Sequence, residues 1–223
     1  MKAHARRWSL ALLAAAVCAG CDPATTAYFL FPESKDAPEL HRLSSDDKNK
    51  EVKVAILTHT QLETRPELIQ ADRQLAESLA KQLRERFTEN REKVTVLSPR
   101  RVEDYKNAHP RWHDPMEVGR ELKVDYVIYL EINSMGLYEK GSSNLMYRGR
   151  ASITVSLVDV NHPDDNPEQT EISVEYPSEA RGPIDASMDT SPMQFRAAFL
   201  SYVAKRLSWC FTGHRKREAS FVE

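Results

Sequence analysis

Glycine is scarce in this sequence, at 7 of 223 residues. Glycine-rich loops that cradle phosphate groups therefore have little material. The sequence also has no Gly-x-Ser-x-Gly, which would place a nucleophilic serine on a sharp turn, and no His-Glu-x-x-His, the motif of many zinc hydrolases. These absences argue against common hydrolase and nucleotide-binding classes, and we expect no cofactor.

An excess of positive charge is missing too. The formal net charge is −2 with histidine neutral. Domains that bind nucleic acid normally carry a basic patch or a basic balance, so we expect no nucleic-acid partner. Long apolar runs are also missing, because the stretch Trp8–Val17 is well short of the about 20 residues that a membrane-spanning helix needs.

Cysteine occurs 3 times, and Cys18 and Cys21 form a Cys-x-x-Cys. In a cytosolic chain this spacing would suggest a redox pair or half of a zinc site. The surroundings indicate something else. The chain opens with basic residues and continues with the apolar stretch Trp8–Val17 and then small residues, which is the order of an export signal. We predict a signal peptide over residues 1–20.

The end of this signal, Ala19-Gly20-Cys21, resembles the bacterial lipobox, with Cys18 where that motif usually has leucine. The resemblance implies cleavage before Cys21 and acylation of its sulfur and amino group, so that Cys21 is a lipid anchor. Cys18 would leave with the signal. Ordinary cleavage with a free Cys21, or an uncleaved membrane anchor, stays open. The third cysteine, Cys210, lies on the apolar side of a predicted helix, as a buried structural thiol would.

Composition divides the chain into four segments. Residues 1–20 are the predicted signal, and residues 21–50 are the lipidated cysteine and a mostly polar tether. Residues 51–211 are the predicted α/β domain, and 212–223 are a charged tail. One folded domain of this size is ordinary.

The first part of the domain alternates between strand and helix patterns. Compact apolar runs at 52–57, 93–98 and 124–132 predict strands. A helix is predicted from the capping box Thr64–Glu67 to about Phe87. Its predicted apolar face consists of Leu75, Ala76, Leu79, Ala80, Leu83 and Phe87.

Two short helices are predicted between the second and third strands. The first covers 100–108. The second begins with Asp114 as N-cap and Pro115 in the first turn, a favoured start, and ends near Leu122.

The rest of the domain has the period of antiparallel strands. Residues 151–157 alternate between apolar and polar, the alternation slips at Val158–Val160, which suggests a β-bulge, and residues 171–176 alternate again. Residues 193–211 predict a closing helix. The predicted fold class is α/β, in the mixed α+β sense. It is a single three-layer domain whose mixed sheet has three parallel-type strands, followed by an antiparallel meander and the C-terminal helix.

This order of elements, with the run Gly119–Ile128 leading into the third strand, resembles the α/β domain shared by the curli-secretion lipoprotein CsgG, the peptidoglycan-synthase activator LpoB and the N-terminal domain of TolB. The likeness spans roughly Val52 to Phe211 and implies an architecture more than an activity. CsgG builds a pore from long β-hairpins. Here the predicted tips 140–144 and 161–169 are polar and Met135–Lys140 is short, so we expect no pore.

Three histidines are the candidate ligand-binding residues. His59 follows the first strand, where α/β sheets often bind ligands, although a hydrogen-bonded loop histidine is the alternative. His109 and His113 could hold a divalent metal together with Asp114. Pro110 and the cap role of Asp114 favour a loop and a helix start instead. We therefore predict no metal site and no catalytic residue.

Several charged residues are singled out with these histidines. Asp125 and Glu131 share a face of the third strand, where acids should be exposed or paired. Arg100 and Arg101 could meet an acidic partner, and the tail residues His214–Arg217 could touch anionic lipid or glycan. A solvated helix start and a solvated tail are the plainer interpretations.

These patterns predict a lipoprotein of the bacterial cell envelope that faces the periplasm. Its partners would be the membrane, through lipid on Cys21, and an unknown envelope protein, on which its domain docks as an interaction, assembly or regulatory module. We expect no enzyme. The alternative hypothesis is an exported protein that binds a small ligand or metal, or a hydrolase, with a site near His59 or His109/His113. Asp22 would imply inner-membrane retention under enterobacterial sorting, and the choice between inner and outer membrane stays open.

Overall fold

The computed structural model describes residues 35–40, 43, 50–60, 66–187 and 190–215. The predicted signal over residues 1–20, together with Cys18 and Cys21, lies outside these ranges. The described residues contain the whole predicted α/β domain except for residues 61–65 and 188–189.

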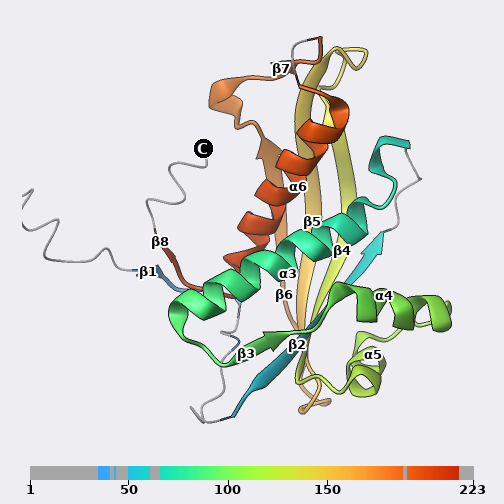
Figure 1. The fold of residues 1–223 in the computed structure, drawn as a ribbon, viewed down its shortest axis with the longest axis vertical. Helices are drawn as coiled ribbons and strands as arrows, with labels where there is room; N and C mark the ends of the chain where they lie inside the picture. Colours follow the sequence, from blue (N-terminus) through green and yellow to red (C-terminus); the bar gives the residue numbers. More distant parts are fainter. Residues whose placement is uncertain (1–34, 41–42, 44–49, 61–65, 188–189, 216–223) are drawn as a thin grey trace, which may run out of the picture.

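A mixed sheet organises the domain (Figure 1). Its strands are, in spatial order, β3 (Val94–Val96), β2 (Val52–Thr60), β4 (Tyr126–Tyr138), β5 (Met146–Asp159) and β6 (Glu168–Tyr176). β2 is parallel to both β3 and β4, whereas β4, β5 and β6 are antiparallel to one another. The short β7 (Ile184–Asp185) pairs with the start of β5. The predicted fold class is confirmed.

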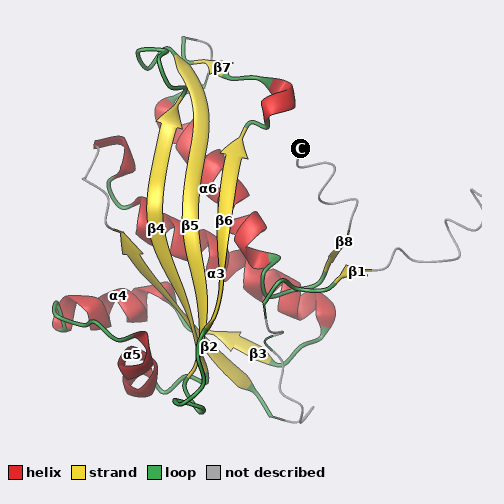
Figure 2. Cartoon of the chain, turned by 180° about the vertical axis from the view of Figure 1, so that it is seen from behind, coloured by secondary structure: helices red, strands yellow, loops and turns green. Residues whose placement is uncertain are grey.

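Helices cover this sheet on two faces, which gives three layers. α3 (Ala71–Asn90) and α6 (Pro192–Ser208) cross one face (Figure 1). α4 (Pro99–Ala108) and α5 (Pro115–Leu122) cover part of the other. Seen from behind, the upper part of β4, β5 and β6 has no helix in front of it (Figure 2).

The two faces of β2 belong to two apolar cores. Val54 and Ile56 pack with α3 and α6, whereas Ala55 and Leu57 pack with α4 and α5. Successive side chains of a strand point to opposite faces. A compact apolar run is therefore what a strand buried on both faces requires.

The apolar face predicted for the long helix is confirmed, because all its members are buried in α3. Its predicted start is wrong. Pro66–Leu68 form a short 3₁₀ turn, η1, and α3 begins at Ala71. Gln70 between them has a left-handed backbone with φ 61°, so the turn at Pro66 cannot continue into the helix. Thr64 lies outside the described residues.

The β-bulge expected at Val158–Val160 is absent from the described strand pair. The register of β4 and β5 runs without a break from Ile128↔Leu157 to Tyr126↔Asp159. The apolar pattern changes there because Val158 packs in the second core, under α4 and α5, while Leu157 packs in the first. Where neighbouring residues of a strand are both buried, one on each face, the sequence shows two adjacent apolar residues, and this was interpreted as a slipped register. The register shifts that do occur lie further along β4, between Ile132 and Ser134 and between Gly136 and Tyr138.

The β4–β5 hairpin is longer than predicted, because β4 continues to Tyr138 rather than ending at Ile132. The argument from a short Met135–Lys140 segment is therefore wrong. Met135, Leu137 and Tyr147 are buried in the first core, which α6 shares. The apolar side chains of this hairpin thus face the helix layer.

The predicted starts of α5 and α6 fit the structure, unlike that of α3. Asp114 caps α5, and its Oδ1 accepts a hydrogen bond from the backbone N–H of Met116 at 2.8 Å. α6 begins with a capping box between Ser191 and Gln194. It ends at Ser208, earlier than the predicted Phe211, which is nevertheless buried.

Part of the predicted tether belongs to the folded domain. Lys35–Asp36 form β1, which pairs with β8 (His214–Arg215). Leu40 and Leu43 are buried in the first core. The packed structure therefore begins before residue 51, although the sequence there is mostly polar.

Candidate functional site

The carboxyl ends of β2 and β4 form the topological switch point of the parallel part of the sheet. β2 leads through α3 to β3 on one side of it, and β3 leads through α4 and α5 to β4 on the other side. Open α/β sheets bind ligands at such reversals of strand order, next to the carboxyl ends of the strands. His59 lies here as predicted, opposite Glu131 in the register of β2 and β4.

His59, Trp112, Tyr129 and Glu131 form what we call the His59 cluster, and all four are half-buried. The edge of Trp112 meets His59, with ring centroids 5.9 Å apart at an interplanar angle of 89°. Trp112 also meets Tyr129, with centroids 6.2 Å apart at 89°. The Tyr129 hydroxyl donates to Glu131 Oε1 at 3.3 Å. Edge-to-face contacts of this kind hold the rings in a defined arrangement.

Burial and charge keep the Tyr129 phenol protonated. Burial, followed by the negative charge of Glu131 and the hydrogen bond to it, raises the pKa of Tyr129 to about 12. The phenol is then a neutral donor, and the carboxylate of Glu131 has no salt bridge among the described residues. The cluster holds a carboxylate, an imidazole and a protonated phenol beside the Trp112 ring, and none of its four members is a serine, threonine or cysteine.

Sequence analysis missed Trp112 and Tyr129. Tyr129 could have been found, since it alternates with Glu131 on one face of β4 and stands beside the strand of His59. Trp112 could not, because it comes from the loop between α4 and α5. Its position depends on how those helices pack.

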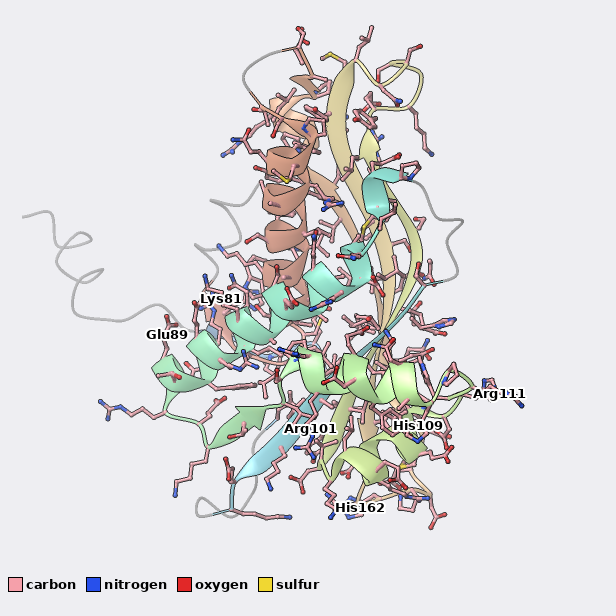
Figure 3. All side chains as sticks on the ribbon, turned by 45° about the vertical axis from the view of Figure 1, so that its right-hand side comes forward. Lys81, Glu89, Arg101, His109, Arg111 and His162 are labelled. Atoms are coloured by element: carbon pink, nitrogen blue, oxygen red, sulfur yellow. The ribbon has the colours of Figure 1, made fainter. Side chains whose placement is uncertain are left out.

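The other two predicted histidines do not join this cluster through any described contact. His109 ends α4 and stacks on Tyr105, with ring centroids 4.3 Å apart, and its Nδ1 lies 3.1 Å from the Tyr105 carbonyl oxygen. His109 and His113 are exposed, and Figure 3 shows His109 and Arg111 at the outer end of α4. The Asp114 carboxylate caps α5. Within the described ranges, no three His, Cys, Asp or Glu side chains come together as metal ligands.

Asp125, predicted to be exposed or paired, joins three segments of the chain. Its Oδ2 accepts from the backbone N–H of Lys53 at 2.8 Å, and its Oδ1 accepts from the Asn161 side chain at 3.3 Å. The backbone carbonyl of Asp125 accepts from Val160. This carboxylate ties β2 and the end of β5 to the start of β4, which is a structural role.

An ion-pair group that sequence analysis missed lies on the sheet face opposite α6. It consists of Glu139, Arg148, Arg150 and Glu175. Arg148 Nε lies 3.1 Å from Glu139 and its Nη1 lies 3.0 Å from Glu175. Arg150 contacts the same two acids at 2.9 Å and 3.0 Å. Each arginine contacts both glutamates, so these ion pairs link the end of β4, the start of β5 and the end of β6.

The remaining candidates have simple environments. Cys210 is fully buried, and burial raises the pKa of its thiol to about 12, which confirms the expected buried cysteine. Arg100 and Arg101 are exposed at the start of α4, and Figure 3 shows Arg101 there. No helix in the described part of the chain is both long and apolar enough to cross a membrane.

Comparison with known proteins gives matches of structure alone. No family model matches the sequence. No curated protein matches it either. Among solved structures, the PelC dodecamer from Paraburkholderia phytofirmans is 10% identical over 79% of this chain and 96% of its own, with a TM-score of 0.41.

Two further similar structures are a lipoprotein and a domain of LpoB. Lipoprotein GNA1162 from Neisseria meningitidis is 14% identical over 70% of this chain and 98% of its own, with a TM-score of 0.41. The LpoB C-terminal domain from Salmonella enterica is 13% identical over 58% of this chain and 87% of its own, with a TM-score of 0.32. All three TM-scores are low, and we draw nothing about function from these matches.

Proposed function

We propose that the protein is a bacterial envelope lipoprotein, anchored through acylated Cys21 and facing the periplasm, whose α/β domain is an interaction module for another envelope protein. The observation that carries the anchor is Ala19-Gly20-Cys21 at the end of a short apolar run with a basic start. An apolar run of that length is too short to span the bilayer, so a lasting attachment needs acyl chains.

The arrangement of the domain supports binding rather than chemistry. The His59 cluster has aromatic and acidic groups without a serine, threonine or cysteine, and it lies at the carboxyl ends of β2 and β4, where sheets of this type bind ligands. Beside it lies the uncovered face of β4, β5 and β6 (Figure 2). The exposed side chains of Asn133 and Glu171 bond there to Thr154 and Ser152 of β5. A partner protein could meet both at once.

The anchor is tested by metabolic labelling with a radioactive fatty acid. Wild type, Cys18→Ser and Cys210→Ser should be labelled and found in the membrane fraction, whereas Cys21→Ser should lose label. All three variants replace a cysteine by serine, so any difference in labelling between them depends on which cysteine was replaced. Label retained in Cys21→Ser, or label lost in all three, would contradict acylation at Cys21.

The partner is tested by site-specific photo-cross-linking in native membranes. A photoreactive residue at Glu171 probes the uncovered sheet face, and one at Lys81, exposed on α3 (Figure 3), is the control. We expect a discrete adduct with one envelope protein from position 171 and none from position 81. Equal adducts from both positions, or none from either, would count against docking on this face.

The second candidate function is an exported protein that binds a small ligand through His59. The specific observation for it is that His59 stands opposite Glu131 at the switch point. It predicts a ligand that survives gentle purification and appears in native mass spectrometry, and that His59→Ala loses. His113→Ala is the control, since this exposed histidine has no described contact with the cluster.

A further inference from the structure

The main sheet ends in two very different strands. β3, at one end of the described strand order, has three residues, whereas β6, at the other end, has nine. Figure 2 shows β6 beside β5 at the border of the sheet. The backbone N–H and C=O groups on the outer side of such a strand can pair with a further strand. Folded proteins limit this pairing by keeping edge strands short, and β3 fits that pattern while β6 does not.

The backbone of β6 is regular throughout. Its register with β5 runs without a break from Gly149↔Tyr176 to Leu157↔Glu168, so no β-bulge turns it away from a neighbouring strand. No proline lies within it, and Pro177 follows its last residue. β6 is therefore built as a strand that another strand can join.

Two glutamates of β6 bond to β5 of the same chain. Arg148 Nη1 lies 3.0 Å from Glu175 Oε1, and Arg150 Nε lies 3.0 Å from Glu175 Oε2. Glu171 Oε1 accepts a hydrogen bond from the Ser152 hydroxyl at 2.7 Å. Charged side chains can protect an edge strand from pairing. Here these two carboxylates are held inward, over the sheet, so they protect the edge less.

The core side of β6 is apolar and only partly covered. Ile172 and Tyr176 are half-buried and pack against the first core, and Val174 between them is buried. Tyr176 also meets Tyr202 of α6, with ring centroids 5.1 Å apart. A further strand beside β6 would remove more of Ile172 and Tyr176 from water. Burial of apolar surface favours such an association.

The sequence of β6 is complementary to a second copy of itself. Residues directly opposite each other in an antiparallel pair point to the same face of the sheet. In the register centred on Ile172, all nine residues of β6 find a partner in the second copy. On the open face this register sets Gln169 opposite Glu175, and Glu171 opposite Ser173. No glutamate then stands opposite another glutamate.

The core side matches in the same register. Ile172 stands opposite Ile172 of the second copy, and Thr170 stands opposite Val174. β-branched side chains of this kind pack well against each other across paired strands. The polar residues of β6 thus meet polar residues on the open face, while its β-branched residues meet one another on the core face.

The neighbouring registers bring glutamates together. Centring the pair on Glu171 sets that carboxylate opposite its own copy. Centring it on Ser173 sets Glu171 opposite Glu175. Like charges directly opposite each other destabilise a strand pair. Charge therefore selects the register centred on Ile172.

We propose that two copies of this chain pair through β6, antiparallel and about a twofold axis at Ile172, so that their sheets become one. Each copy uses the same surface, so the assembly closes at two chains. The His59 cluster lies on β2, on β4 and in the loop after α4, on the far side of β5 from this interface. The dimer leaves the cluster accessible. This inference goes beyond the proposed function and does not depend on acylation of Cys21.

The register is tested by thiol cross-linking of the full chain in membranes. In Ile172→Cys, the two engineered thiols should face each other across the axis. In Gln169→Cys, the matched control on the same strand, they should be about 20 Å apart, since residues advance about 3.4 Å along a strand. We expect a short bifunctional maleimide to join two copies of Ile172→Cys, and to join neither Gln169→Cys nor wild type.

The control position is the more accessible of the two, since Gln169 is exposed and Ile172 is half-buried. Poor access therefore cannot explain cross-linking at position 172 alone. Equal cross-linking of the two variants, or none from Ile172→Cys, would overturn the proposed register.

A pair of charge variants tests the dimer by a second measurement. Because Ser173 stands opposite Glu171, Ser173→Glu adds like pairs on both sides of the axis, and Ser173→Lys adds opposite pairs. In sedimentation equilibrium of the full chain in detergent, Ser173→Glu should weaken association several-fold and Ser173→Lys should strengthen it. The same substitutions at Ser134, exposed on β4, are the controls and should change nothing. A monomeric wild type, or equal responses at both positions, would refute the dimer.

The photo-cross-link at position 171 separates this proposal from the proposed function. Mass spectrometry of the adduct shows whether it contains only this chain, as the dimer predicts, or another envelope protein. A dimer without an envelope adduct would support pairing through β6 and count against the interaction module. An envelope adduct with a chain that stays monomeric would leave the proposed function standing and refute the dimer.

Discussion

Tyr147 and Phe195 stack with ring centroids 4.6 Å apart and 13° between their planes. Tyr147 comes from β5 near the tip of the long hairpin, and Phe195 from the first turns of α6. Tyr138 stacks on Tyr147, with ring centroids 5.3 Å apart. The ring of Tyr176 lies near Phe195, with centroids 5.8 Å apart. These rings fasten the distal half of the sheet to α6.

Removing the central ring should weaken the whole domain. Phe195→Ala deletes a fully buried ring and leaves a cavity, so we expect a loss of about 3–5 kcal/mol in the free energy of unfolding. Met193→Ala on the same helix is the control, because Met193 is 72% exposed and its change should stay within about 0.5 kcal/mol. Urea denaturation measures both. Similar losses for the two variants would contradict the packing described here.

Gly149 should not tolerate a methyl group. A Cβ at this position of β5 would overlap the ring of Phe199 on α6, whereas a Cβ at Gly136 of β4 would meet no atom within 4 Å. Overpacking typically costs about 1–3 kcal/mol, so we expect that loss for Gly149→Ala. Gly136→Ala should be neutral or stabilising by up to about 1 kcal/mol. Thermal unfolding of the two variants checks the difference, and equal melting temperatures would refute it.

The ionisation of Tyr129 should report on Glu131. Burial is the largest cause of the raised pKa of about 12, so Glu131→Gln should lower the pKa without returning it to the ordinary value near 10. Glu171→Gln, on the same sheet face, should leave it unchanged. Carbon NMR of labelled tyrosine rings during an alkaline titration measures this, and Tyr129→Phe assigns the signal. A Tyr129 pKa that Glu131→Gln leaves unmoved would contradict the Tyr129–Glu131 contact.

The same pKa sets the sign of a stability change. The folded chain keeps the Tyr129 proton at pH values where the unfolded chain has lost it. The contribution of Tyr129 is therefore fully present below about pH 10 and declines as the pH rises to about 12. In Tyr129→Phe, the free energy of unfolding should fall less steeply over that range than in wild type.

Cys210 should be unreactive in the folded protein. Its thiol is fully buried, and burial raises its pKa to about 12, so almost no thiolate forms near neutral pH. We expect no reaction with Ellman's reagent until denaturant is added. An engineered thiol at exposed Ser134, made as Ser134→Cys, is the positive control and should react at once. Rapid native reaction that Cys210→Ser removes would contradict this burial.

Most of the helices and strands could be predicted from the sequence, because their signals are local. The four-residue spacing of Leu75, Leu79, Leu83 and Phe87 places them on one face whatever the helix packs against. Asp114 caps α5 by accepting a hydrogen bond from the backbone N–H of Met116, only two residues away. The predicted helix start at Thr64 failed because the left-handed backbone at Gln70 carries no strong sequence signal.

The candidate site could be predicted only in part. His59 was placed at the correct end of the first strand because it comes directly after an apolar run, although it lies within β2 and not after it. Its neighbours Trp112 and Glu131 could not be assigned to it, since their approach depends on the parallel register of β2 with β4 and on the loop after α4. His109 and His113 are close in sequence, yet no described contact joins them to His59.

The amino-acid sequence by itself determined the features that depend on near neighbours. These are the export-like start, the order of strands and helices, the buried stripe of α3 and the fold class. The tertiary structure decided which distant residues meet: His59 with Glu131, Tyr147 with Phe195, and Lys35 with Arg215. It also decided that Val158 and Leu157 are both buried, on opposite faces. The reason is physical, because periodicity and capping act within a few residues, whereas register and layer packing are set by side chains that come together only when the whole chain has folded.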